Sequence, residues 1–203
     1  MARISDEASL RALYGQPGER SLKKQLDRLD VHCRNFIALS PFVVLSTTGG
    51  DGLPDITPRG DAPGFIAVLD DKTLLLPDRL GNNRLDNLAN VFANPGVGLL
   101  FLVPGIDETL RVHGTAEIRD DAELLARCVA DGKPPKTVLV VTVVEAYYQC
   151  AKALMRSHLW DPATRIDRAS FPSLGQILKD QIAGNTLCET QEEMVERYRE
   201  TLY

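Results

Sequence analysis

The sequence has no apolar run long enough to cross a bilayer. Its longest such runs, Val97–Val103 and Val138–Val144, are far shorter than the roughly 20 residues of a transmembrane helix. The first residues, Met1–Asp6, also lack the apolar core of a signal peptide. We therefore expect a cytoplasmic protein without a membrane partner.

Positive charge is scarce as well. The chain has 23 lysine and arginine residues against 28 aspartate and glutamate residues, a formal net charge of −5 over 203 residues. Such a balance provides no electrostatic footprint for nucleic acid. We expect no nucleic-acid partner, and any anion site must come from a local concentration of arginine.

Motifs for metals and disulfides are missing. The cysteines and histidines are Cys33, Cys128, Cys150, Cys188, His32, His113 and His158. They form no C-x-x-C pair and no H-E-x-x-H motif, which predicts free thiols and no metal site. Packing or solvation explains His32 and Cys33 better than catalysis does, since both fall inside an amphipathic stretch.

The motifs of the common nucleotide-binding and hydrolase folds are also absent. No G-x-G-x-x-G, Walker A or G-x-S-x-G pattern occurs, so dinucleotide-binding, P-loop and α/β-hydrolase folds have no support. Nothing in the spacing favours a hydrolytic triad built on Ser46 or Ser157.

The apolar periodicity divides a single domain, residues 1–203, into three parts. Residues 1–40 predict helices at Ser5–Tyr14, stopped by Gly15, and at Glu19–Leu39. In residues 41–145 the helical periodicity gives way to short apolar runs separated by turn residues, a pattern typical of antiparallel strands. Residues 146–203 predict a less regular segment, a helix over Phe171–Ala183 and a terminal helix.

Capping boxes are predicted at two helix starts. In both Asp120–Glu123 and Thr190–Glu193, a residue suited to the N-cap position stands three residues before a glutamate.

Seven strands are expected in the middle part. They are Phe42–Thr48, Leu53–Pro58, Phe65–Leu69, Thr73–Leu76, Val97–Val103, Thr109–Ile118 and Thr137–Val144. Pro54 and Pro58 cannot donate to a strand ladder, so the second strand should lie at an edge. The last strand is β-branched almost throughout, which predicts a buried central position. Tight connections with one helical crossover indicate a mainly β fold with flanking helices, a closed or half-closed antiparallel barrel.

The stretch Pro77–Leu88, PDRLGNNRLDNL, combines arginines with a predicted helix start. A strand leads into a loop with Arg79 and Arg84, and a helix is predicted over Asn83–Ala93. With Asn82 or Asn83 as N-cap, the unpaired N–H groups of the first turn and the arginines would form a site for a phosphate ester. On the loop alone, an ordinary capped helix with solvated arginines explains these residues equally well.

The stretch Pro58–Ile118, which contains this loop, and the segment CAKALMRS, Cys150–Ser157, resemble the pyridoxamine 5′-phosphate oxidase-like family of FMN-binding split barrels. The resemblance implies a split β-barrel of six or more strands. It also implies a homodimer that binds two FMN molecules at the subunit interface, with residues from both chains, and that acts on a small-molecule substrate.

Carried onto this chain, the Ser-Arg-Lys phosphate loop of the family falls on Asn82–Asn83–Arg84, where only Arg84 is cationic. A phosphate monoester carries roughly −1.5 to −2 charges at neutral pH, so other cations should compensate, with Arg59 and Arg79 as candidates. The resemblance places Thr109 and Arg111 near the flavin. The full set of candidate cofactor-binding residues is Arg59, Asp78, Arg79, Asn82, Asn83, Arg84, Thr109, Arg111, Lys152, Arg156 and Trp160.

Within that set, Arg111 or Lys152 could place positive charge near the N1–C2=O edge of the ring, and Trp160 could cover it. The R-x-H substrate pattern of the family has no counterpart in LCETQEEMVERYRETLY, which argues against a B6 vitamer as substrate. The sequence thus predicts an FMN-dependent oxidoreductase with no assigned catalytic side chain. The alternatives are a module that stores or senses flavin without turnover, and a split barrel adapted to F420 or haem.

Overall fold

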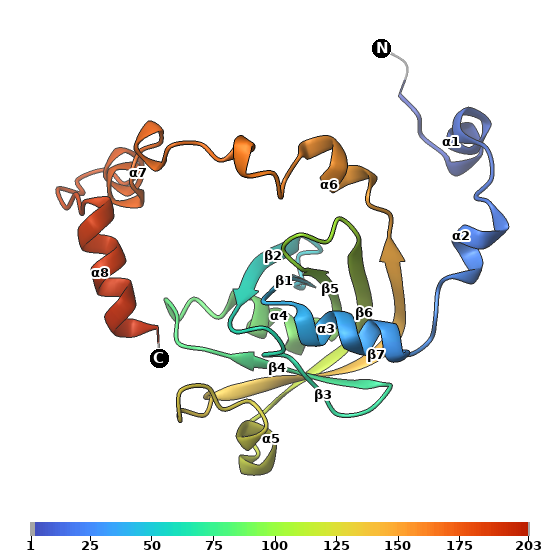
Figure 1. The fold of residues 1–203 in the computed structure, drawn as a ribbon, viewed down its shortest axis with the longest axis horizontal. Coiled ribbons are helices and arrows are strands. Elements are labelled where there is room, and N and C mark those ends of the chain that lie inside the picture. Colours follow the sequence, from blue (N-terminus) through green and yellow to red (C-terminus); the bar gives the residue numbers. More distant parts are fainter. Residues whose placement is uncertain (1–2, 203) are drawn as a thin grey trace.

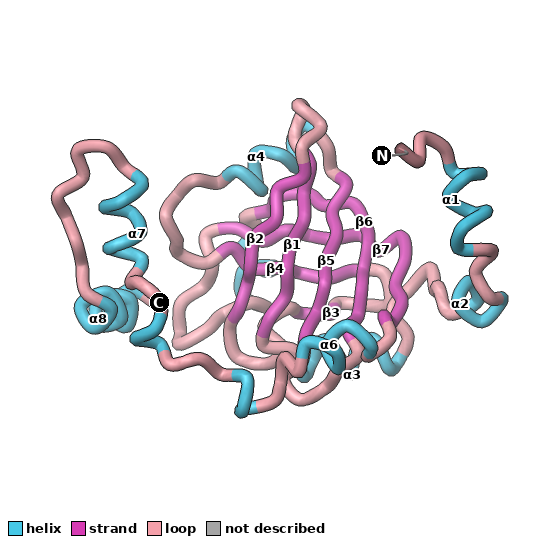
Figure 2. The backbone as a smooth tube through the Cα atoms, turned by 90° about the horizontal axis from the view of Figure 1, so that it is seen from above, coloured by secondary structure: helices cyan, strands magenta, loops and turns pink. Residues whose placement is uncertain are grey.

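A single antiparallel sheet forms the centre of the computed structural model, which describes residues 3–202 (Figures 1 and 2). Its strands are β1 (Phe42–Thr48), β2 (Pro54–Gly60), β3 (Ala67–Val68), β4 (Thr73–Asp78), β5 (Gly96–Leu102), β6 (Thr109–Arg119) and β7 (Thr137–Gln149). They are ordered β2-β1-β5-β6-β7-β4-β3, and every neighbouring pair is antiparallel. The predicted antiparallel, mainly β fold with flanking helices is confirmed.

The positions of individual strands follow from their residues. Strand β2, with its two prolines, lies at an edge of the sheet as predicted. Strand β7 lies between β6 and β4, also as predicted, and continues to Gln149 because its pairing with β6 runs that far. The strand expected at Phe65–Leu69 is reduced to Ala67–Val68, which pairs only with β4.

The core lies on the inner face of the curved sheet. In β1 and β5 every second residue is buried, as expected when one face of a strand is covered. Phe101, Leu99 and Leu45 are among the largest fully buried side chains, and Ile37 of the third helix and Leu88 of the fourth belong to the same cluster.

Helices precede, interrupt and follow the sheet. They are α1 (Glu7–Tyr14), α2 (Glu19–Lys23), α3 (Val31–Leu39), α4 (Asp86–Ala93), α5 (Ala122–Ala126), α6 (Lys152–Ser157), α7 (Leu174–Gln181) and α8 (Gln191–Thr201), with 3₁₀ turns at Pro162–Thr164 and Arg168–Ser170. The arm that carries α6 to α8 arches around the sheet on the side away from α1 and α2 (Figure 1). Within residues 3–202, no helix has the length and apolar character needed to span a membrane.

The single helix predicted over Glu19–Leu39 is wrong. The chain leaves the helix after Lys23, and Leu26 forms a β-bridge with Ala146 of β7, with N–H···O distances of 2.9 and 2.8 Å in the two directions. A new helix then begins because the Asp30 side chain accepts a hydrogen bond from the Cys33 N–H at 2.8 Å. A contact with a distant strand thus overrides the local helical periodicity.

The other terminal helices agree more closely with prediction. Helix α1 ends at Gly15, whose φ of 74° suits a glycine, and the Thr190–Glu193 capping box is confirmed. The capping box expected at Asp120–Glu123 does not form, because α5 begins with Asp121, not Asp120, at the N-cap. The Asp121 side chain accepts hydrogen bonds from Arg119 and does not cap the helix. Helix α7 covers Leu174–Gln181 and is shorter than expected, since Ser173 caps its N-terminus.

Replacing the glycine at the β-bulge between β6 and β7 tests how closely these two strands approach. The register of β6 against β7 shifts between His113 and Gly114, and a Cβ at Gly114 would lie 2.2 Å from the carbonyl oxygen of Thr142. Because that oxygen belongs to the paired strand, we predict that Gly114→Ala lowers the free energy of unfolding by about 3 kcal/mol in urea denaturation. Gly98→Ala in β5 is the matched control, because its Cβ would meet only side-chain atoms at 3.6 Å or more. Equal losses for the two variants would contradict this account of the bulge.

Candidate functional site

A cavity of about 990 Å³ lies beside β2 and the loop that follows β4. Its walls are residues 55–60 and 77–88, Phe65, and four residues of the C-terminal helix region: Arg197, Tyr198, Thr201 and Leu202. Six of the predicted cofactor-binding residues line it together: Arg59, Asp78, Arg79, Asn82, Asn83 and Arg84. Its volume is at the upper end of the range typical of small-molecule sites.

Two crossed ion pairs connect the end of β2 with the end of β4 beside this cavity. Arg59 Nη1 donates to Asp78 Oδ1 at 2.6 Å, and Arg79 donates to Asp61 Oδ2 at 3.0 Å. The side chains are mostly shielded, with exposures of 22% and 16% in the first pair and 19% and 5% in the second. Strands β2 and β4 are not neighbours in the sheet, so these pairs connect its two outer parts and curl it toward a barrel.

One donor in the first pair has no partner. The Nε atom of Arg59 is buried and makes no hydrogen bond within residues 3–202. An unsatisfied buried donor costs roughly 1–3 kcal/mol. Arg59 itself lines the cavity, so this unpaired donor belongs to a residue of the candidate site.

The loop after β4 differs from the predicted helix start. Helix α4 begins at Asp86, because Asn83 and Leu85 both adopt left-handed φ values of 58° and 59°. Neither Asn82 nor Asn83 is the N-cap, and the Asn82 side chain instead accepts a hydrogen bond from the Arg84 N–H at 3.1 Å. Leu85 occupies the N-cap position without a side-chain hydrogen bond, so the first turn of α4, which lines the cavity, keeps N–H groups without a side-chain cap.

Arg84 is the most accessible of the loop cations. Its side chain is 74% exposed and pairs with Asp86 at 2.8 Å. An exposed pair of this kind contributes little to stability, so Arg84 can reorient toward a ligand at low cost.

Four residues that the sequence did not indicate connect α4 to the β1–β2 hairpin. Asn87 and Asn90 of α4 both donate to the hydroxyl of Thr47 in β1, at 2.9 and 3.1 Å, and Asn90 also donates to Asp55 at 2.5 Å. Thr47 is buried. These contacts fix the first turn of α4 against the β1–β2 hairpin, and no motif spacing in the sequence could have revealed them.

The other five predicted residues do not line this cavity. Thr109 is buried at the start of β6, and Arg111 donates to the Tyr147 hydroxyl at 2.7 Å. The indole N–H of Trp160 donates to the Ile106 carbonyl at 2.9 Å, while Lys152 and Arg156 are exposed on α6. They form a second group near the start of β6 and the end of β7.

The cysteines nearest the core are poor nucleophiles. Burial raises the pKa of the Cys33 thiol to about 12. Burial also raises the pKa of Cys128, although the positive charge of Arg79 opposes that shift. A thiol with a raised pKa carries little thiolate at neutral pH, so neither side chain suits covalent catalysis.

The family model of pyridoxamine 5′-phosphate oxidase matches residues 29–150, which contain α3 and the entire sheet. The chain belongs to this family. The matched segment includes the cavity walls at residues 55–60 and 77–88, whereas the wall formed by α8 lies outside it.

Some solved structures are similar to the chain in shape. HupZ of Group A Streptococcus is 18% identical over 60% of this chain and 99% of its own, with a TM-score of 0.50. An FMN-binding protein from Syntrophomonas wolfei is 18% identical over 71% of this chain and 97% of its own, with a TM-score of 0.47. An F420 reductase is 20% identical over 56% of this chain and 94% of its own, with a TM-score of 0.42. At these identities the likeness to HupZ supports the fold alone. No protein of the curated set matches the chain.

The contribution of the Arg59–Asp78 ion pair to stability can be measured without a ligand. We predict that a double-mutant cycle on Arg59 and Asp78 gives a coupling energy of about 1–3 kcal/mol in urea denaturation, because both side chains are largely shielded from water. The same cycle on the exposed Arg84–Asp86 pair is the control and should give less than about 0.5 kcal/mol. Equal coupling energies would show that the Arg59–Asp78 pair does not hold the sheet together.

Proposed function

We propose that the chain is an FMN-binding flavoprotein and that its cavity beside β2 holds the phosphate of the cofactor. The observation that carries this proposal is the buried Nε of Arg59, a donor without a partner among the described residues in a cavity that Arg79 and Arg84 also line. Membership of the pyridoxamine 5′-phosphate oxidase family supports the choice of cofactor.

The charges around the cavity fit a phosphate monoester. Arg59 and Arg84 each pair with a carboxylate, yet a guanidinium has five N–H donors and each pair uses only one or two of them. A phosphate can therefore join these two arginines without displacing their carboxylates. The side-chain amides of Asn82 and Asn83 add neutral donors for the phosphate and the ribityl chain.

We propose a homodimer with the cofactor at its interface. The ring-end candidates, Arg111 and Trp160 among them, lie apart from the cavity in one protomer, so a second copy would have to bring its own group over the cavity. The outer face of the sheet suits such an interface, because Val44, Leu100 and Leu102 on that face remain partly exposed.

The chemistry we propose is oxidation or reduction of a small organic substrate. FMN, when bound, supplies hydride exchange at its N5 atom. The protein binds and orients the cofactor through the cavity arginines. Arg111, positioned by the hydroxyl of Tyr147, or Lys152 would stabilise negative charge on the reduced ring. This chemistry requires no side-chain nucleophile, and we propose that it takes place in the cytoplasm.

A visible absorption spectrum of the purified protein, with mass identification of any bound small molecule, tests the cofactor. We expect the spectrum and mass of FMN. A deazaflavin or haem spectrum would overturn the proposal in favour of those cofactors. Reduction of the bound flavin by NAD(P)H, followed by reoxidation with substrate, would distinguish an enzyme from a module that only stores or senses flavin.

Arg84 allows a quantitative test of the phosphate site. We predict that Arg84→Ala weakens FMN binding by about 1.5–3 kcal/mol, or about 10- to 150-fold, because a charged hydrogen bond to phosphate is lost. The measurement is a fluorescence titration of the apoprotein. Arg127→Ala, which removes an exposed arginine that does not line the cavity, should bind FMN as the wild type does. Unchanged affinity for Arg84→Ala would remove Arg84 from the site.

A further inference from the structure

The C-terminal helix forms part of the wall of the cavity. Arg197, Tyr198 and Thr201 of α8 line it together with Leu202, and β2 and the loop after β4 form the other walls. These residues lie far along the chain from the loop and outside the segment that matches the family model. They therefore bring to the site a contribution that the family match does not describe.

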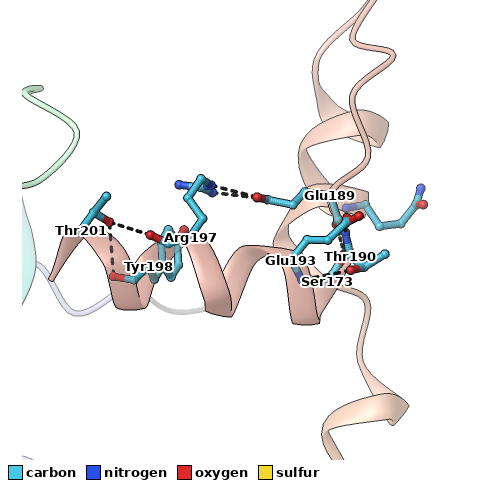
Figure 3. Close-up of polar contacts among 8 residues, drawn as sticks. Ser173, Glu189, Thr190, Glu193, Arg197, Tyr198 and Thr201 are labelled. Atoms are coloured by element: carbon cyan, nitrogen blue, oxygen red, sulfur yellow. Dashed lines mark hydrogen bonds and ion pairs between the residues drawn. The ribbon is translucent and has the colours of Figure 1, made fainter.

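Helix α8 is held in place around Glu189, as Figure 3 shows. The Ser173 hydroxyl donates to the Glu189 carbonyl at 3.1 Å, and the Thr190–Glu193 capping box closes the first turn of α8. Gly175 of α7 approaches so closely that a Cβ there would lie 2.2 Å from the Glu189 carbonyl oxygen. Helices α7 and α8 thus form a packed unit that gives Glu189 a defined position.

Glu189 in turn positions the guanidinium of Arg197. Arg197 donates to the Glu189 carboxylate through Nε at 2.8 Å and through Nη2 at 2.7 Å, and its Cζ lies 4.7 Å from the ring centre of Tyr198 (Figure 3). These hydrogen bonds lower the pKa of Glu189, so the carboxylate remains ionised through the neutral range. Glu189 engages Nε and Nη2 of Arg197 and leaves Nη1 outside this contact.

The charge balance of the cavity favours a ligand role for Arg197. The carboxylates paired with Arg59 and Arg84 themselves line the cavity, whereas Glu189, the partner of Arg197, does not. Arg197 therefore contributes positive charge to the cavity without an accompanying acid on its wall. The Asn82–Asn83–Arg84 segment, which has only one cationic side chain, lacks such a cation.

We propose that α8 is the outer wall of the phosphate site and that Arg197, oriented by Glu189, is a further ligand of the bound phosphate monoester. This inference rests on the proposed function, because it takes FMN as the phosphate ester in the cavity. Glu189 is a positioning residue, and the ring of Tyr198 lies against the guanidinium of Arg197.

The test is a titration of the apoprotein with FMN and, separately, with riboflavin, which lacks the phosphate. Arg197→Ala should weaken FMN binding by about 10-fold or more and leave riboflavin binding unchanged. Arg199→Ala is the matched control: Arg199 is on the same helix, pairs with Glu196 and does not line the cavity. It should change neither affinity.

A second variant separates ligand binding from anchoring of the helix. Glu189→Gln removes the charge that orients Arg197 but keeps the guanidinium and an oxygen acceptor for it, so FMN binding should weaken by about two- to fivefold, less than in Arg197→Ala. If Glu189→Gln weakens FMN binding as much as Arg197→Ala does, the role of Arg197 is to anchor α8, and the inference is overturned.

The remaining outcomes distinguish failure of this inference from failure of the proposed function. If the wild type binds FMN and Arg197→Ala matches Arg199→Ala, or if Arg197→Ala weakens FMN and riboflavin equally, this inference fails while the proposed function stands. If the wild type does not bind FMN, both fail together.

Discussion

Two crossed ion pairs connect the outer parts of the sheet, and the candidate site depends on them. Arg59 and Asp61 are separated only by Gly60 at the end of β2, and Asp78 and Arg79 are consecutive at the end of β4. Each side carries one cation and one anion, so exchanging the partners would place Arg59 beside Arg79 and one aspartate beside the other. Like charges in such shielded positions are costly. The pairs therefore specify one register for the closure of the sheet.

The same closure creates the chemistry of the cavity. It buries the guanidinium of Arg59 and leaves its Nε without a partner among the described residues. It also brings the end of β2 next to the loop that carries Arg84, whose side chain is still exposed. A shielded arginine of fixed position and an accessible arginine of variable position thus face one ligand. The first fixes where an anion binds, and the second can adjust to it.

Local signals in the sequence predicted the sheet better than the helices. Short apolar runs separated by turn residues and the prolines of β2 are properties of neighbouring residues, and they predicted the strands and the edge position of β2. The long second helix failed because Leu26 pairs with Ala146 of β7, which no local pattern reveals. At the site, the loop cations could be predicted from one contiguous stretch and its family resemblance. Arg197 could not, because only the fold brings α8 to the cavity.

A crystal structure of the protein with FMN bound is the most direct test of this account. It should show a phosphate oxygen within hydrogen-bonding distance of Arg59 Nε, with the Arg59–Asp78 and Arg79–Asp61 pairs both retained. A phosphate bound elsewhere, with Nε still lacking a partner, would contradict the claim that closure of the sheet builds the cofactor site.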